Sequence, residues 1–314
     1  MAEKSLVAPR PMPAVWMVAS SFVFASMGVC VKYAAEHFTS AELVFYRGVL
    51  GIFFMAAYAR ATGTSLRTRV PAMHAWRSVI GVMSLSAWFY AIAHLPLATA
   101  MTLNYMSSVW IAAFLVGGSI LLGRPNQRGT RQGPLVLTIL ASFAGVVMLL
   151  RPAMDQNQTF AGIMGLLSGL GAAFAYMQVM AISRLGEPET RTVFYFAVGT
   201  TVAGALGMLV TGISPWNWQH ALWLPPLGIL ASLGQLAMTK AYSMSSTSDS
   251  HGGTLMVANL QYSGIVFAAL YSLVLFGDNI PLVGWAGMAL IIVSAIIATV
   301  LRANAAPNAP AKEH

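Results

Sequence analysis

Two stretches of the sequence, Val44-Phe45-Tyr46 and Val193-Phe194-Tyr195, repeat the same three residues about half a chain apart. Each stretch lies in an apolar segment long enough to cross a lipid bilayer as a helix. The first copy is followed by Arg47 and the second by Phe196. The repeat predicts two copies of one membrane unit that share a scaffold and differ by a charge.

The composition is that of an integral membrane protein. Of the 314 residues, 57% are hydrophobic and only 8% are charged, and the mean hydropathy is +0.70. A chain with so little polar surface cannot coat a soluble globule. Alternation of polar and apolar residues with a period of two is absent, so helices are expected rather than a barrel.

Apolar segments of about 18 to 25 residues recur along the chain, each long enough to cross a hydrocarbon core of about 30 Å. We predict an all-α integral membrane fold of ten transmembrane helices. The ten spans lie at residues 13–35, 40–61, 73–95, 98–123, 133–150, 161–182, 192–212, 222–243, 252–276 and 283–301.

The order of the segments also repeats. Gly133 and Arg151 bracket the fifth span at nearly the same separation as Gly284 and Arg302 bracket the tenth. Because each half holds five spans, an odd number, the second half must lie upside down relative to the first. We therefore predict two inverted five-helix repeats.

The repeats divide the chain into four parts. The first repeat covers residues 13–151 and the second covers residues 161–302. Residues 1–12 form an amino-terminal tail. Residues 303–314 are rich in Ala, Pro and Asn, and we expect them to form a disordered tail.

The distribution of basic residues predicts the orientation. If the amino terminus is cytoplasmic, the external connections hold only Arg151. The tails and internal connections then hold Lys4, Arg10, Arg60, Arg67, Arg69, Arg124, Arg128, Arg131, Arg184, Arg191, Arg302 and Lys312. Because cytoplasmic loops carry an excess of Lys and Arg, both termini are expected in the cytoplasm.

Other partners are disfavoured. The net charge of +8 comes from basic residues scattered over short loops without interleaved aromatic residues, so no nucleic-acid partner is expected. Cys30 is the only cysteine, which excludes an intramolecular disulfide. His94 and His251 have no carboxylate or cysteine company, so no metal site is predicted, and no cofactor is expected.

A membrane-embedded enzyme and a channel are the competing functional classes. The sequence contains no G-x-S-x-G, H-E-x-x-H or P-loop motif, and no connection is long enough for a soluble catalytic domain. A channel needs rings of pore-lining residues, which two repeats in one chain do not obviously provide. These features favour a transporter, whose partners are a small-molecule substrate and the lipid bilayer.

Longer motifs resemble a known family. The first half reads Ser40-Ala41-Glu42-Leu43-Val44-Phe45-Tyr46-Arg47-Gly48 and then Trp88-Phe89-Tyr90-Ala91-Ile92-Ala93 followed by Leu95-Pro96-Leu97-Ala98. The second half ends with Phe276-Gly277-Asp278 and the apolar run Ala289-Leu290-Ile291-Ile292. In this order, and over nearly the whole chain, they resemble the EamA family of the drug/metabolite transporter superfamily.

Two positions depart from the pattern of that family. Gly123-Arg124 stands where the family commonly has Gly-Glu. Met106-Ser107-Ser108-Val109 stands where the family often has a proline, which predicts a different bend in span four. Neither departure changes the expected fold.

The resemblance implies an alternating-access carrier in a bacterial inner membrane, with a cavity between its halves, similar to bacterial aromatic-amino-acid and metabolite exporters. On this basis we expect transport of a small amphipathic metabolite, an amino acid or related compound. A larger nucleoside- or vitamin-like metabolite is the alternative. The sequence leaves open the identity of the substrate, the direction of transport and its coupling to another solute or to protons. It also leaves open the oligomeric state, which can be a monomer.

Arg47 is the foremost candidate for contact with a substrate. It lies about two turns inside span two, where a cation needs water, a partner or a ligand. A structural role is the alternative, since Glu42 could pair with it imperfectly. Lys240 is a second candidate, unless its side chain snorkels to the interface. Arg77, near the start of span three, is expected to be an interfacial anchor.

Neutral polar side chains inside the spans complete the candidate site. They combine hydrogen-bonding groups with aromatic faces, as suits a solute with a polar head and an apolar or ring body. Trp88 and Gln261 share this character. Hydrogen bonding between helices is the alternative role for each of them. The predicted substrate-binding residues are Arg47, Tyr90, Asn104, Tyr105, Tyr176, Gln178, Lys240, Asn259 and Tyr262.

Overall fold

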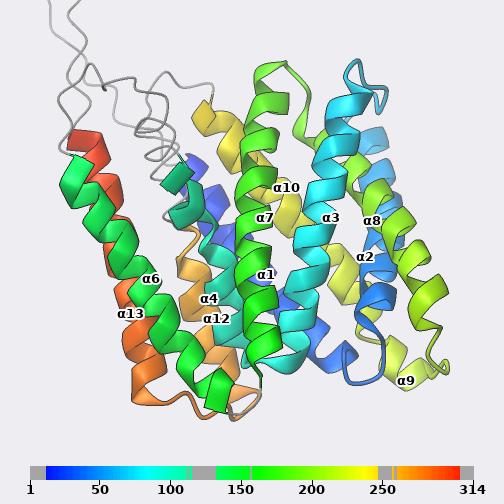
Figure 1. Ribbon diagram of the computed structural model, residues 1–314. Coiled ribbons are helices and arrows are strands. Elements are labelled where there is room, and N and C mark those ends of the chain that lie inside the picture. Colours follow the sequence, from blue (N-terminus) through cyan, green and yellow to red (C-terminus); the bar gives the residue numbers. More distant parts are fainter. Residues whose placement is uncertain are drawn as a thin grey trace, which may run out of the picture.

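A computed structural model describes residues 12–111, 113–114, 132–155, 158–246, 257 and 260–304. Within these residues every regular element is a helix and no strand is present. The helices pack side by side in a bundle (Figure 1). The predicted all-α fold is therefore confirmed for this part of the chain.

Most helices begin and end within a few residues of the predicted spans, because the apolar segments fix their positions. In the first half they are α1 (Met12–Ala34), α2 (Ser40–Ala61), α3 (Pro71–His94), α4 (Leu97–Tyr105) and α6 (Gln132–Asp155). In the second half they are α7 (Thr159–Arg184), α8 (Glu189–Thr211), α9 (Trp218–Ala221), α10 (Leu224–Ser246), α12 (Ser263–Val274) and α13 (Leu282–Asn304).

Span four differs from the continuous helix that we predict. Helix α4 ends at Tyr105, and Met106 forms a turn before the chain becomes helical again at residues 107–111. The Met106 amide donates to the Leu103 carbonyl at 3.3 Å. This bond spans three residues, as in a 3₁₀ turn, instead of the four residues of an α-helix. The irregularity falls at the segment where the sequence predicts a different bend. The rest of this span, including Gly123-Arg124, lies mostly outside the described residues.

Five helices are long and apolar enough to cross a membrane: Met12–Ala34, Ser40–Ala61, Thr159–Arg184, Glu189–Thr211 and Trp218–Met244. Three shorter apolar helices lie at Val136–Leu149, Ser263–Val274 and Leu282–Ile297. Several membrane spans are thus present among the described residues. The count of ten, and the inverted relation of the halves, stay predictions.

The surface of the bundle is apolar where a soluble protein would be polar. Phe53, Leu209, Val210 and Leu282 point outward, and each is more than two-thirds exposed. Polar side chains such as Glu42 are instead buried. Such a surface matches lipid hydrocarbon, in which the helices satisfy their own backbone groups.

The most extensive helix contacts join the two halves of the sequence. Helix α2 packs on α8, α6 on α13, α1 on α10 and α3 on α7 (Figure 1). Each of these four pairs takes one helix from residues 13–151 and one from residues 161–302. The halves therefore form one interleaved bundle rather than two separate domains.

Helices α2 and α8 run in opposite directions at close range. A methyl group added at Gly48 would clash with Thr201, and one added at Gly204 would clash with the backbone of Phe45. The two glycines thus let the helix backbones approach each other, as small residues do at membrane helix interfaces. This contact joins the two helices that carry the doubled motif.

We predict that Gly204→Leu lowers the stability of the folded protein by about 1–3 kcal/mol, because the new side chain overpacks the α2–α8 contact. Thermal unfolding of the purified protein in detergent measures the effect. Val202→Leu is the matched control, since Val202 lies on the same helix and is 56% exposed. Equal unfolding midpoints for the two variants would contradict the close packing.

Candidate functional site

A small cavity lies inside the bundle, between helices of both halves. Its volume is about 50 Å³, enough for a few water molecules but well below the roughly 300–1,000 Å³ of usual ligand sites. The site is therefore too small for a metabolite in this conformation. Its walls are formed by Phe24, Arg47, Arg77, Gly81, Ser84, Leu85, Trp88, Asn104, Tyr105, Ala172, Tyr176, Phe196, Gln235 and Met238.

Arg47 lies on this cavity, roughly 10 Å along α2 from its first residue at 1.5 Å per residue. Only 5% of Arg47 is exposed. Its guanidinium carbon lies 5.1 Å from the centre of the Phe196 ring. A cation over an aromatic face is attracted by the ring quadrupole.

Glu42 does not pair with Arg47, although the sequence leaves that role open. Its carboxylate accepts hydrogen bonds from Thr39 in the capping box of α2 and from the Ser214 hydroxyl at 2.6 Å. Glu42 thus caps its own helix and ties it to the connection after α8. The charge of Arg47 is left without this partner.

Arg77 is the main residue that the sequence analysis misplaced. It is 2% exposed and lies on the cavity, with its guanidinium carbon 4.1 Å from the centre of the Phe196 ring. The prediction that Arg77 is an interfacial anchor is therefore wrong. Gly81, one turn later in α3, leaves room for the guanidinium, since a methyl group there would clash with Arg77. The Arg-x-x-x-Gly spacing places the two residues on one face of the helix, but the sequence does not show that this face points inward.

The two arginines have no acidic partner on the cavity. Among the described residues none of the cavity-lining side chains is acidic. The ion pairs within this part of the chain are Lys32–Asp278, His74–Glu187 and Arg191–Glu187. Burying a charge costs several kcal/mol unless a partner compensates it. The cavity therefore holds two cations whose burial the surrounding protein offsets only in part.

Several polar atoms at the cavity have no hydrogen-bond partner among the described residues. They are Arg47 Nε, Arg77 Nε and Nη1, Trp88 Nε1 and the Tyr105 hydroxyl. Buried polar groups normally have a partner, and groups that lack one mark a reactive or binding site, or an unseen water or ion. These atoms can each donate a hydrogen bond to a ligand.

Other polar groups near the cavity are held in place by neighbours. Asn104 donates to the Ser168 hydroxyl at 3.0 Å. Gln261 donates to the Tyr176 hydroxyl at 3.1 Å and accepts from Tyr242 at 3.4 Å. Tyr176 and Tyr242 also stack, with ring centres 5.5 Å apart. These hydrogen bonds and the stacking fix the orientation of Tyr176, which forms part of the cavity wall.

The predicted residues divide into two groups. Arg47, Asn104, Tyr105 and Tyr176 line the cavity. The others do not: Tyr90 stacks on His94, Lys240 lies over the Trp16 ring, and Gln178 and Tyr262 lie apart from the cavity wall. Asn259 lies outside the described residues. Gln235 and Arg77 line the cavity from α10 and α3 but are not among the predicted residues.

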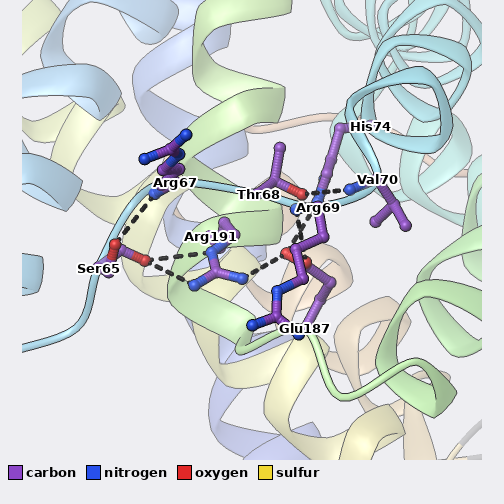
Figure 2. Close-up of polar contacts among 8 residues, drawn as sticks. All are labelled: Ser65, Arg67, Thr68, Arg69, Val70, His74, Glu187 and Arg191. Carbon is purple, nitrogen blue, oxygen red and sulfur yellow. Dashed lines mark hydrogen bonds and ion pairs between the residues drawn. The ribbon is translucent and has the colours of Figure 1, made fainter.

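At one end of the bundle a polar network joins the two halves. Arg191 donates to the Ser65 carbonyl at 3.1 and 2.9 Å and to the Glu187 carboxylate at 2.9 Å (Figure 2). Glu187 also contacts the His74 ring at 3.3 Å and accepts from the Arg69 amide at 3.4 Å. The connection between α2 and α3 is thereby attached to the connection between α7 and α8. A polar hollow of about 650 Å³ lies beside this network.

A second link joins the halves at the opposite end. Lys32 near the end of α1 pairs with Asp278, which follows α12, at 3.4 Å. Lys32 also donates to the Leu95 carbonyl at 3.1 Å. Each end of the bundle therefore has a polar contact that links the first and the second half.

The sequence is similar to that of the pseudopaline exporter of Pseudomonas aeruginosa (strain UCBPP-PA14). The two chains are 30% identical over 279 residues, which cover 89% of this chain and 93% of the exporter. The chain belongs to this exporter's family of membrane transporters. With its apolar helices, it is a multi-pass membrane protein. No family model matches the sequence.

Two further comparisons agree with this assignment. The riboflavin transporter of Rhizobium johnstonii is 26% identical over 234 residues, which cover 73% of this chain and 74% of that transporter. A solved crystal structure aligns with a TM-score of 0.64 over 93% of this chain and 98% of the other, at 18% identity. The second likeness concerns the fold alone.

We predict that Arg77→Met raises the stability of the folded protein, by about 1–4 kcal/mol, because it replaces a buried cation without an acidic partner by an apolar side chain of similar length. Thermal unfolding in detergent measures the change. Arg60→Met, at an exposed position in the last turn of α2, is the control and should leave the midpoint nearly unchanged. A lower midpoint for Arg77→Met would show that the cation stabilises the fold.

The Glu187 network predicts a pH dependence of stability. Burial raises the pKa of the Glu187 carboxyl group, but hydrogen bonds from Arg191 and His74 outweigh burial, so the pKa lies below its usual value. Since the pKa is lower in the folded state, the stabilisation is complete above the unfolded pKa of about 4.3 and is lost as the pH falls through the folded pKa.

Glu187→Gln should accordingly destabilise the protein by roughly 1–3 kcal/mol at neutral pH, and the difference from the unsubstituted protein should shrink only below about pH 4.3. Unfolding midpoints between pH 7 and pH 3 test this. Glu36→Gln, at an exposed position, is the control. A difference that disappears near neutral pH would assign the effect to another group.

Proposed function

We propose that this chain is a secondary transporter of the EamA type in the drug/metabolite transporter superfamily, and that it moves a small amphipathic metabolite across the bacterial inner membrane by alternating access. The observation that carries this proposal is the cavity inside the bundle, where buried cations, polar groups and aromatic faces meet. An amino acid or a related compound fits the family resemblance.

A larger vitamin- or nucleoside-like metabolite is the second candidate. The relative named as a riboflavin transporter supports it, since that name describes a compound of this class. Trp88, Tyr105 and Tyr176 line the cavity with aromatic faces that suit a ring system. Both candidates share a polar head and a ring or apolar body.

The helix contacts support the inverted repeat in this proposal. The predicted repeat matches α1 with α7, α2 with α8, α3 with α10, α4 with α12 and α6 with α13. If each helix is replaced by its counterpart in the other half, the α1–α10 contact becomes the α3–α7 contact. The α2–α8 and α6–α13 contacts stay the same. The hydroxyls of Ser142 and Ser294, 2.6 Å apart, join the middle parts of α6 and α13. A two-fold relation between inverted halves accounts for these contacts.

The charges support a cytoplasmic location for the end with the Glu187 network. The connections there carry Arg67, Arg69 and Arg191, as cytoplasmic connections commonly do. They lie at the upper end of the bundle in Figure 1, whereas α9 lies at the lower end. In the proposed orientation, both termini are cytoplasmic and the Lys32–Asp278 pair faces the outside.

The two polar links suggest how the ends open in turn. The Ser65–Arg191–Glu187 contacts would break when the cavity opens to the cytoplasm, and the Lys32–Asp278 contact would break when it opens to the outside. Inverted repeats allow such rocking around a fixed site. The closed cavity corresponds to the intermediate between these two states.

Counterflow in proteoliposomes tests the transport function. Liposomes loaded with a defined mixture of amino acids, nucleosides and vitamins should exchange one or a few members with the same labelled mixture outside, and the exchange should saturate. Arg47→Ala should lower the exchange roughly 10- to 100-fold, since a hydrogen bond to a charged group is lost.

Arg60→Ala is the matched control, because Arg60 is an exposed arginine on the same helix and should exchange normally. Chemical conversion of a solute, or an ohmic conductance, would contradict the carrier function. Unchanged exchange by well-expressed Arg47→Ala would refute the role of that residue alone.

A further inference from the structure

Arg47 and Arg77 are the only charged side chains on the cavity wall among the described residues, and no ion pair within that part of the chain involves either. We propose that the substrate is a net-negative metabolite whose carboxylate binds between these two guanidinium groups. The proposal rests on the transporter function proposed above and narrows its substrate class.

The unpaired atoms favour an acceptor with several lone pairs. Arg47 contributes one unpaired N–H position and Arg77 contributes two, while Trp88 and Tyr105 add an indole N–H and a hydroxyl. An ionised carboxylate only accepts hydrogen bonds, and a guanidinium binds it with two parallel bonds. The two groups therefore complement each other in charge and in geometry.

The same wall disfavours a positively charged head group. An ammonium group needs acceptors, and in buried sites a carboxylate as counter-ion. The described part of the cavity wall has no carboxylate, and it already carries two positive charges. A cation would be repelled, and a zwitterion would have to place its ammonium beside like charges. A net-negative compound avoids both costs.

The rest of the cavity wall suits a ring or an apolar body, which a wider state of the cavity would admit. Trp88 follows Arg77 on α3 by eleven residues, roughly 16 Å along the helix. Tyr105, Tyr176 and Met238 line the same cavity. Trp88 is thus set apart from Arg77 along α3, so that in a wider state a carboxylate at the arginines would place its body toward Trp88.

The hollow at the Glu187 end adds a second, weaker attraction. Arg67, Arg69 and Arg191 line it together with Glu187, so that positive charge predominates there. An excess of one sign of charge in a hollow raises the local concentration of counter-ions. Anions would accordingly be drawn to the end from which the cavity opens to the proposed cytoplasmic side.

Four probes that share a benzene ring separate the charge types. Phenylacetate carries a carboxylate, phenylacetamide is neutral and phenethylamine is a cation. Phenyl phosphate is an anion that carries a phosphate group in place of the carboxylate. Each is added to the purified full-length protein in detergent, and the unfolding temperature is measured. We expect phenylacetate at millimolar concentration to raise it by roughly a few degrees, since a ligand that binds only the folded state stabilises it.

Variants test whether the arginines cause this shift. Arg47→Gln and Arg77→Gln should each remove most of the phenylacetate shift, whereas Arg60→Gln, at an exposed position, should retain it. Arg47→Lys and Arg77→Lys keep the charge but lose the two-pronged geometry, so they should give a reduced shift. If a glutamine variant does not fold, the phenylacetate shift of the corresponding lysine variant is used in its place.

The proposal is overturned if phenylacetate gives no shift, if phenylacetamide or phenethylamine gives an equal shift, or if the arginine variants respond like the unsubstituted protein. A shift with phenyl phosphate alone would overturn the carboxylate assignment. Counterflow separates this proposal from the transporter function: exchange restricted to neutral or cationic solutes refutes the anionic class and leaves the carrier standing. Arginine-dependent binding of phenylacetate without exchange of any solute supports the anion site and refutes the carrier.

Discussion

The ring of Phe196 lies against two buried cations, and the organisation of the cavity depends on this contact. The guanidinium carbons of Arg77 and Arg47 lie 4.1 and 5.1 Å from the ring centre. The negative face of the ring offsets part of the hydration that each cation loses on burial. Because a ring carries no net charge, the compensation is partial, and N–H groups of both arginines stay without a partner among the described residues.

The doubled Val-Phe-Tyr motif explains why Phe196 is found beside Arg47. The two copies are followed by different residues, Arg47 in one and Phe196 in the other. Since α2 and α8 pack against each other in opposite directions, the two positions at which the copies differ come together. Arginines at both positions, 47 and 196, would repel each other. Phenylalanines at both would leave the cavity without a charge from either position. A repeated scaffold thus yields a site whose two charged side chains, in the part of the chain that the structure describes, both come from the first half.

The helices and one of the two cations could be predicted from the sequence, but the inward faces of the helices could not. Apolar length locates a membrane helix, and the depth of Arg47 in span two identifies it as unusual. A helix such as α8 is apolar all round, so periodicity does not reveal which face points inward. For this reason Tyr90 and Lys240 could not be separated from Tyr105, and the burial of Arg77 required the neighbouring Gly81 to be seen in three dimensions.

Closure at both ends and buried charge in the middle act together in the proposed mechanism. The contacts of Arg191 at one end and of Lys32 at the other link the two halves on either side of the cavity. Attraction between an anion and the two arginines would be strongest while both links are formed and the site is buried, and it would weaken when either end admits bulk water. Opening therefore lowers the affinity and releases the substrate. An empty site gains nothing from closure, because its cations would lose hydration without an anion, so closure is favoured when substrate is bound.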